Sequence, residues 1–395
     1  MGSPDLPSDI IFEILSRTSL KTLGRCAFVC KDWNRMVYES SFMHAFCQRT
    51  KAISGFFLQS RFVGRPFAEF VSNYSMQDSD SKLSLDFLPR NVNIEAATKQ
   101  GILLCVKELD TKILRIPEYY VCKPSTKEWH KIPNPKTRYF TERLAMVVLR
   151  SQPLHYVIVR FSEPRSRWRT YNSKMYISHH CEIFDSETWA WKQLQDVLLP
   201  YDMFFGTDPA VSACGVLHWL MSDNQVFAFD KDTESWTTFD LPFPLCKKNY
   251  FKHTKLVEYN GHLAMLCTEN HGEFAQLWVM VDSESKVWMK RQRMSIEAVR
   301  GVERHSFPVA MDSSDITLMR GFYSVIYYNF TTFRSKRCFV QRIQPDEVFP
   351  FQSDLEPAYL KNYWKKEQFS RFLRWVCLFI CSCLYSLFQY FYSST

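Results

Sequence analysis

The chain contains 395 residues, which is enough for a small module and one large domain or for three modest domains. Its 46% hydrophobic and 23% charged residues are ordinary for a globular protein, and its net charge of +8 is mild. Thirteen cysteines without C-x-x-C spacing, and no apolar N-terminal signal segment, argue against a secreted disulfide framework and favour a reducing compartment.

The first 48 residues predict three short helices with a broad apolar surface. Pro7 suits the first turn of a helix, where its missing N–H costs nothing. Apolar residues at i,i+4 spacing then cover adjacent faces: Ile10 with Ile14, and Ile11 with Leu15. A second helix is predicted to begin after Ser19, and a third to carry Trp33. Because units of about 40 residues usually need a staple or a partner to be stable, we expect a binding partner.

This stretch resembles the F-box, whose pattern is spread in register over three helices. The resemblance covers about residues 4 to 48. The sequence departs from the pattern where the family usually has Arg-Leu-Pro, because Arg17 is followed by Thr18 and Ser19. The matching residues are Leu6, Pro7, Asp9, Glu13, Ile14, Leu15, Lys21, Leu23, Arg25, Val29, Cys30, Lys31 and Trp33.

The resemblance implies docking onto a Skp-type adaptor and, through it, a cullin–RING ubiquitin ligase. The apolar contacts that it implies are Leu6, Pro7, Ile10, Ile14, Leu15, Val29, Cys30 and Trp33. One alternative is a helical cap that packs on its own downstream domain. Another is a helix-turn-helix DNA reader that uses Lys31 to Arg35. Five basic and five acidic side chains in residues 1–48 leave no net charge, so we expect no nucleic-acid partner.

After residue 49 the sequence predicts strands and a repeated turn. In each copy a Ser or Thr stands three residues before a Trp, and three copies place an Asp three residues earlier still. Such a turn closes when Asp accepts backbone N–H bonds, and the Trp then packs against the neighbouring unit. A weaker copy runs from Tyr328 to Thr332. The turn residues, which we expect to be structural, are Thr126, Trp129, Asp185, Trp191, Asp230, Trp236, Asp282 and Trp288.

The spacing of these turns favours a β-propeller. The Trp residues are 62, 45 and 52 residues apart, close to the period of about 50 for kelch-type blades. The array resembles the F-box-associated domain that follows many plant F-boxes. It is closer to that domain than to true kelch repeats, because the chain has only 11 glycines and no Gly-Gly doublet. The two resemblances together cover about residues 4 to 345.

No pattern in the large domain indicates catalysis. The chain has no Gly-x-Ser-x-Gly elbow, no phosphate-binding glycine loop and no His-Glu-x-x-His motif. His179 and Cys181 could share a metal, while His180 between them would point to the other face of a strand. We expect instead that all three are ordinary strand residues without a metal. We therefore expect no catalytic residue, metal or cofactor. A propeller enzyme or glycan-binding module with a helical N-terminal cap is the alternative.

Two basic segments stand out from the rest of the large domain. One carries Arg160, Arg165, Arg167 and Arg169 around Trp168 and could bind an acidic partner or nucleic acid, although a solvated loop is the expectation. The other runs from Lys286 to Arg304, and here too a solvated segment is the expectation.

The C-terminal tail is basic and then apolar. Residues 375–392 carry no charge over eighteen positions, which is at the lower limit for a membrane-spanning helix. Lysines and arginines precede this run, as in a membrane anchor that faces the cytosol. A packed helical end is the alternative, because serines and Gln389 dilute the apolar run.

The sequence therefore predicts an α+β chain in three parts. Residues 1–48 are expected to form a three-helix F-box, residues 49–345 an all-β kelch-like propeller, and residues 346–395 a tail with an apolar helix. We expect a non-catalytic substrate-recognition subunit of a Skp–cullin–F-box ubiquitin ligase, acting in the cytoplasm or nucleus or tail-anchored to a membrane. Its substrate protein is not encoded in any motif.

Overall fold

The computed structural model divides the chain into two compact units, residues 1–360 and residues 361–395. The residues that it describes are 7–18, 22–23, 26, 29–38, 42, 45–46, 49, 53–60, 67–72, 83–107, 117–151, 153–242, 251–269, 272–311, 316–321, 324–329, 332, 334–339, 345–353 and 358–361. The predicted apolar helix at 375–392 lies outside them. Within this part of the chain, no helix combines the length and the apolar character needed to cross a membrane.

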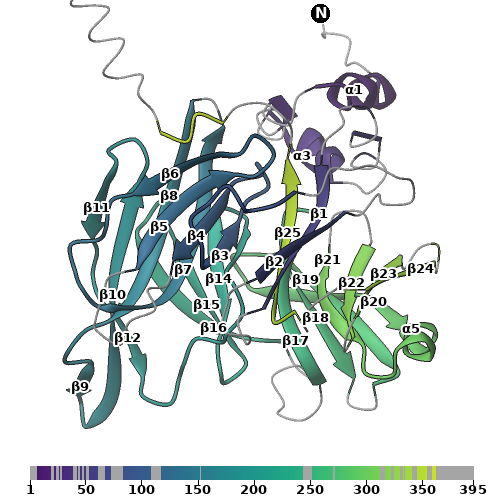
Figure 1. Cartoon of the computed structure of the whole chain (residues 1–395). Coiled ribbons are helices and arrows are strands. Elements are labelled where there is room, and N and C mark those ends of the chain that lie inside the picture. The colour runs from purple at the N-terminus through teal and green to yellow at the C-terminus, as the bar shows by residue number, and fades with distance from the viewer. Residues whose placement is uncertain are drawn as a thin grey trace, which may run out of the picture. The chain divides into compact units, whose positions relative to one another are not determined.

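Two helices of the N-terminal region are described, α1 (Ser8–Leu15) and α3 (Lys31–Tyr38) (Figure 1). Pro7 precedes α1 in an extended conformation, and its carbonyl oxygen accepts the N–H groups of Ile10 at 3.0 Å and Ile11 at 3.1 Å. Asp9 adds a negative charge to the first turn, where it complements the helix dipole. Most of the helix predicted after Ser19 lies outside the described residues.

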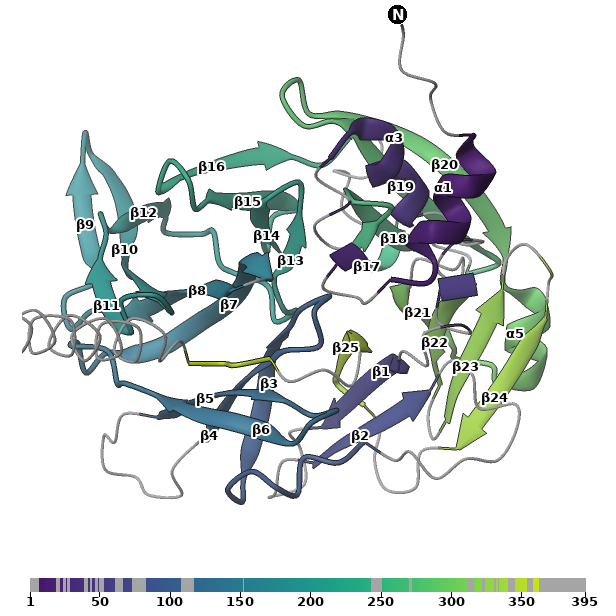
Figure 2. The same cartoon turned by 90° about the horizontal axis from the view of Figure 1, so that it is seen from above.

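The rest of the first unit is built from six antiparallel sheets around a common centre (Figure 2). The predicted β-propeller is confirmed, and the six sheets are its blades. The first two blades are β2 (Phe67–Ser72), β1 (Ile53–Ser60) and β25 (Glu347–Ser353), then β3 (Val92–Ala97), β4 (Leu103–Lys107), β5 (Glu118–Lys123) and β6 (Glu128–Ile132).

The third blade is the largest, because two extra strands pair with one of its four. It contains β7 (Phe140–Ser151), β8 (Leu154–Glu163), β10 (Lys174–Asp185) and β11 (Ala190–Gln193), with β9 (Trp168–Tyr171) and β12 (Val197–Pro200) added along β10. The fourth blade is β13 (Val211–Ala213), β14 (Val216–Leu220), β15 (Gln225–Asp230) and β16 (Ser235–Asp240).

The last two blades follow the same four-stranded order. The fifth is β17 (Phe251–Tyr259), β18 (His262–Glu269), β19 (Phe274–Asp282) and β20 (Val287–Ser295), and α5 (Glu297–Val302) leads out of it. The sixth is β21 (Phe307–Met311), β22 (Ile316–Arg320), β23 (Ser324–Asn329) and β24 (Ser335–Phe339).

The ring closes by pairing the two ends of the propeller. β25 lies antiparallel to β1, with Phe57 opposite Phe349. Gly101 in the second blade approaches Ser353 so closely that a side chain there would collide with it, and Ser353 also shares a 2.8 Å hydroxyl bond with Ser125. Because β25 follows residue 345, the propeller includes residues that the sequence analysis assigned to the tail.

Each pair of neighbouring blades is joined by its own apolar core. Among the described residues, one buried cluster lies at each of the six interfaces. Between the second and third blades, for example, Val121 packs with Met146 and Ile158. Middle strands are therefore almost wholly buried, whereas outer strands such as β16 are mostly exposed. Apolar packing between sheets is what holds the ring together.

The repeated turn is the hairpin that joins the third and fourth strands of a blade. In three copies the Asp Oδ1 accepts two backbone N–H groups, those of residues two and three positions later. The fourth loop position has a positive φ, 54° at Trp189, 52° at Glu234 and 53° at Lys286. The Asx geometry thus explains the Asp and hydroxyl residues of the repeat.

Candidate functional site: the apolar N-terminal face

The N-terminal helices have a core of their own. Leu15, Leu23, Val37, Phe42 and Phe46 are buried together, and Phe12 meets Phe42 edge-on with ring centres 5.1 Å apart. Half-buried side chains from α1 and α3, together with Cys26, complete this cluster. The core is small, as expected for a unit of this size.

Outside this core, three large apolar side chains among the described residues of the module face solvent. Ile10 is 45% exposed, Ile14 is 53% exposed and Val29 is 64% exposed. Ile10 and Ile14 lie one turn apart on the same face of α1. Large apolar side chains that a small module leaves in water are typical of a surface that binds a partner.

The structure separates the predicted contact residues into three groups. Pro7 and Cys30 are exposed and Trp33 is half-buried, whereas Leu6 lies outside the described residues. Leu15 is only 1% exposed and belongs to the core of the module. Leu15 therefore supports the face from below and is not available for direct contact.

Cys30 has a second role that the sequence analysis did not identify. Cys30 directly precedes α3, and its Sγ accepts the backbone N–H of Trp33, the third residue of that helix, at 3.4 Å. This is the position of a helix N-cap, and the thiol here satisfies one of the free N–H groups of the first turn.

Arg49, one residue beyond the predicted end of the helical module, forms hydrogen bonds at the C-terminal end of α1. Arg49 donates to Ser16 Oγ at 2.6 Å and to Glu13 Oε1 at 3.1 Å. The hydrogen bonds from Arg49, supported by Arg17, hold the pKa of the Glu13 carboxyl below its usual range. Residues 36 positions apart meet only in the folded module, so the sequence pattern did not reveal this contact.

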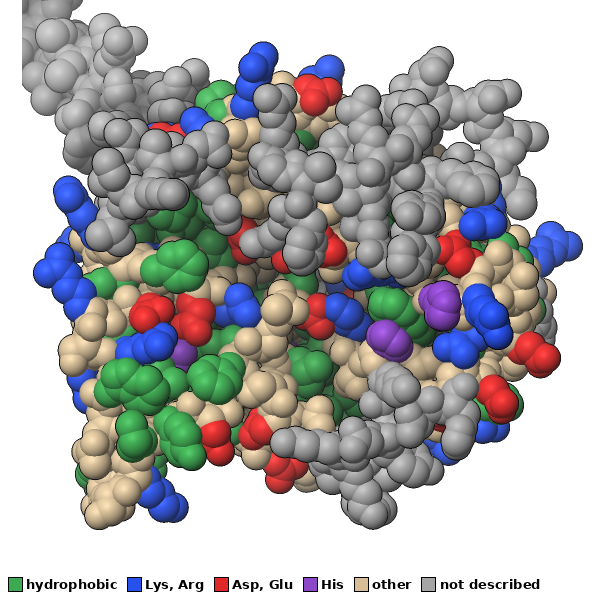
Figure 3. All heavy atoms as spheres, turned by 60° about the horizontal axis from the view of Figure 1, so that its bottom comes forward, with side chains coloured by type: hydrophobic (Ala, Val, Ile, Leu, Met, Phe, Trp, Pro, Cys, Tyr) green, Lys and Arg blue, Asp and Glu red, His purple; other side chains and the backbone are tan. Residues whose placement is uncertain are grey.

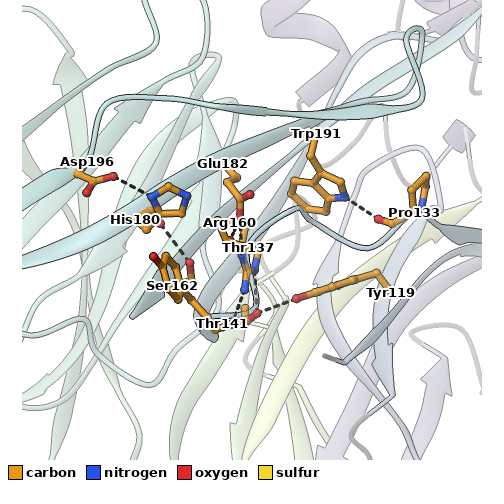
Figure 4. Close-up of polar contacts among 11 residues, drawn as sticks. Tyr119, Pro133, Thr137, Thr141, Arg160, Ser162, His180, Glu182, Trp191 and Asp196 are labelled. Carbon is orange, nitrogen blue, oxygen red and sulfur yellow. Dashed lines mark hydrogen bonds and ion pairs between the residues drawn. The ribbon is translucent and has the colours of Figure 1, made fainter. Parts of the chain in front are cut away.

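The third blade contains a buried ion pair between Arg160 and Glu182 (Figure 4). Arg160 is fully buried and contacts Glu182, and its other N–H groups bond Thr141 Oγ1 at 2.9 Å and Thr137 Oγ1 at 3.0 Å. Thr137 in turn donates to Glu182 at 2.7 Å. Such a satisfied pair joins strands and offers no free group for chemistry. The expectation that Arg160 belongs to an exposed basic loop was wrong.

The two neighbouring histidines each pair with a separate carboxylate. His179 Nδ1 lies 2.6 Å from Glu142, and His180 Nδ1 lies 2.9 Å from Asp196 on the other face of β10. Cys181 is buried, and burial raises the pKa of its thiol to about 12. Across the described residues, no group of three or more His, Cys, Asp or Glu side chains is arranged to hold a metal ion.

The Trp residues of the repeat lie in the outer strands of four blades. Trp191 is 7% exposed and reaches the preceding blade, where its Nε1 donates to Pro133 O at 2.6 Å. Trp236 and Trp288 also pack into clusters shared with the preceding blade. Trp129 differs, because it is 41% exposed beside Tyr120.

Two sequence families match this chain in consecutive segments. The family described as F-box-like matches residues 3–49, and the F-box associated beta propeller domain matches residues 56–364. The chain is similar to F-box protein At5g41720 of Arabidopsis thaliana, with 37% identity over 172 residues that cover 42% of this chain and 91% of that protein. F-box protein At5g49610 of the same plant is 26% identical over 332 residues, which cover 79% of this chain and 85% of that protein.

Solved structures resemble the chain more distantly. Apo AztD from Citrobacter koseri aligns with a TM-score of 0.37 at 9% identity, covering 78% of this chain and 100% of that one. A likeness at this level carries no argument about function.

Proposed function

Because this chain belongs to the plant-type F-box proteins, with an F-box-like segment followed by an F-box associated β-propeller domain, we propose that it recruits a target protein to a Skp–cullin–F-box ubiquitin ligase. The helical module is the part that binds a Skp-type adaptor. The propeller is the part that holds the target, which is then ubiquitinated and degraded by the proteasome.

The observation that supports adaptor binding is the exposed apolar face of α1. Ile10 and Ile14 lie one turn apart, and each is about half in water although the module beneath them has a closed core. Burial of apolar surface stabilises a complex by about 25 cal/mol per Å² before the costs of association. Covering these side chains with an adaptor therefore removes an unfavourable exposure.

The observation that supports binding of a target protein by the propeller is the rigidity of the ring. Six buried clusters join six blades, so loops at the ends of the blades are held at fixed distances from one another. In this proposal the chain performs no chemistry itself. It brings the target close to a separate conjugating enzyme and orients it there, and proximity alone accelerates such transfers strongly.

The test is co-purification of the full chain with a Skp-type adaptor. The informative variants are Ile10→Asp and Ile14→Asp, which place a charge in the proposed interface and should each weaken binding by about tenfold or more. The control is Met289→Asp, because Met289 is a 56% exposed apolar residue on the outer strand β20.

Two results would overturn the adaptor proposal. One is a wild-type chain that is folded by circular dichroism and does not retain the adaptor. The other is equal retention of the adaptor by Ile14→Asp and Met289→Asp. The first result would favour the alternative function, a propeller enzyme or glycan-binding module whose helices are only a cap.

A further inference from the structure

The third blade carries a three-stranded extension that the other blades lack among the described residues. β9 and β12 pair with the two sides of the first half of β10. Asn172 and Ser173, at the tip of the β9–β10 hairpin, have φ values of 46° and 61°. Two successive residues with positive φ form the type I′ turn, whose twist matches that of the strands, so this hairpin is well defined in shape.

The strand register assigns the residues of the extension to two faces. Tyr171 lies opposite Lys174, and Tyr176 lies opposite both Arg169 and Pro200. Because side chains alternate along a strand and directly paired residues share a face, these positions lie on one side of the sheet. Leu198, opposite Ser178, lies on the same side. We call this surface the Tyr171 face: Arg169, Tyr171, Lys174, Tyr176, Leu198 and Pro200.

The other face of the extension leads into the core of the propeller. Ile177 and Leu199 are paired there, and both are buried. β12 accordingly alternates between buried and exposed positions. Trp168 and Met175 lie on this core-side face nearer the tip and are 50% and 49% exposed.

The Tyr171 face exposes large apolar and aromatic side chains, whereas the solvent side of a strand usually carries polar residues. Tyr171 is 67% exposed and Leu198 is 42% exposed, although neither is needed to fill the core. In Figure 3, hydrophobic side chains gather with Lys, Arg, Asp and Glu side chains at the left end, the side on which Figure 1 draws β9, β10 and β12. Exposed tyrosines beside apolar side chains are typical of surfaces that bind protein segments.

Arg169 and Lys174 on the same face have no carboxylate partner among the described residues, whereas Asp196, at the inner end of this face, accepts from Ser178 at 3.3 Å and lies 2.9 Å from His180. Within the described residues, Arg169 bonds only to oxygens of Ser166 and Trp168, and Lys174 forms no ion pair. Arg167 nearby is different, because it pairs with Glu163 at 2.8 Å. Two free cations among tyrosines and Leu198 fit a ligand that has both carboxylates and apolar side chains.

We propose that the Tyr171 face binds an acidic segment of the target protein in which carboxylates alternate with apolar residues. The inference rests on the proposed function, since it names the surface through which the propeller would hold its target. β9 has no strand on its outer side in the part of the chain that the structure describes, so an extended segment can also add to that edge. Two cations on a face that also holds Leu198 and Pro200 suit a peptide better than a phosphate backbone, which is bound through many charges.

The test uses the full chain, with and without a Skp-type adaptor, and three fluorescent probes. They are a short peptide of alternating Asp and Leu, the same peptide with Lys in place of Asp, and a single-stranded oligouridine. The expected result is that the Asp-Leu peptide binds about tenfold or more tightly than the Lys-Leu peptide, and less tightly at high salt. Equal binding of the two peptides, or tighter binding of the oligouridine, would overturn the proposal.

Matched variants locate the binding surface. The double variant Arg169→Glu, Lys174→Glu should weaken binding of the Asp-Leu peptide about tenfold or more. Adding Tyr171→Ser to it should weaken this binding further. The control for the aromatic change is Met175→Ser on the core-side face of the same hairpin. The control for the charge change is Lys290→Glu with Arg291→Glu on β20. Loss of binding in either control to the same extent would contradict the assignment of this face.

Adaptor binding is measured on every variant, so that the two proposals can fail separately. Retained adaptor with no preference for the acidic peptide rejects the Tyr171 face and leaves the ligase role standing. A preference for the acidic peptide in a chain that does not bind the adaptor rejects the ligase role and keeps the binding surface.

Discussion

Lys99 Nζ lies 2.8 Å from Glu258 Oε1, and this contact joins two blades on opposite sides of the ring. Lys99 follows β3 in the second blade, and Glu258 lies near the end of β17 in the fifth (Figure 2). The Glu258 carboxylate also accepts the backbone N–H of Gly261. One ion pair therefore crosses the centre of the propeller between the turns that end its inner strands.

Replacing this carboxylate should have a small and salt-dependent effect. Glu258→Gln removes the charge but keeps an oxygen for Gly261. The side chains of Lys99 and Glu258 are 44% and 19% exposed, so we expect the free energy of unfolding to fall by at most about 1 kcal/mol. Urea denaturation at low and high salt measures this difference, which should shrink at high salt. A loss of several kcal/mol at both salt concentrations would contradict the prediction.

Leu15 and Ile14 are adjacent in sequence but should respond differently to truncation. Leu15→Ala opens a cavity in the small helical core, and we expect the module to lose about 2–5 kcal/mol of stability. Ile14→Ala trims an exposed side chain, and it should weaken adaptor binding with little change in stability. Hydrogen exchange of α1 and α3 gives the stability, and co-purification gives the binding. Equal protection of the two variants against exchange would refute the separation of roles.

Trp191 and Trp129 provide a matched pair for the role of the repeat. Trp191→Phe removes the donor to Pro133 O and part of a buried contact, so we expect a loss of about 1–3 kcal/mol. Trp129→Phe changes a 41% exposed ring and should stay within about 0.5 kcal/mol of wild type. Thermal unfolding of the two variants measures the contrast. Equal shifts in the melting temperature would show that the outer-strand Trp residues do not join the blades.

His218 should make the propeller sensitive to acid. Burial lowers the pKa of this imidazole to about 4, against about 6.5 in an unfolded chain. The unfolded chain therefore takes up a proton that the folded chain resists. The stability is complete above about pH 6.5 and is lost as the pH falls toward about 4, by up to about 3 kcal/mol.

The check for His218 is denaturant unfolding at about pH 7.5 and about pH 5. His218→Gln should lose less stability than wild type on acidification, because its side chain does not titrate. His262→Gln on β18 is the control at an exposed position. If wild type and His218→Gln lose the same stability between the two pH values, other groups account for the acid sensitivity.

Much of the architecture was predictable from short patterns. The spacing of Asp185, Asp230 and Asp282 marks the same hairpin in three blades, because a side chain that closes a turn acts within a few residues. For the same reason the N-terminal motif predicted α1 and α3. Six blades could not be counted, because the turn with Asp and Trp is absent from the first blade and weakened in the sixth.

The parts that escaped prediction depend on residues far apart in the chain. The pairing of β1 with β25 joins strands almost a whole propeller apart in the sequence, and no local pattern encodes it. Arg160 looked like a member of a basic surface loop because its partner Glu182 lies on another strand. Leu15 was expected among the contact residues because the resemblance to the F-box implied it, and the apolar pattern of the helix does not say which of two adjacent faces is covered.

The closure of the ring by β25 also orders events during protein synthesis. The helical module and β1 are synthesised first, and one edge of β1 stays unpaired until residues 347–353 have been synthesised. Until then the nascent chain exposes a strand edge that invites association with other chains. A message truncated before codon 347 therefore yields an open-ended propeller that still carries the F-box-like module at its start.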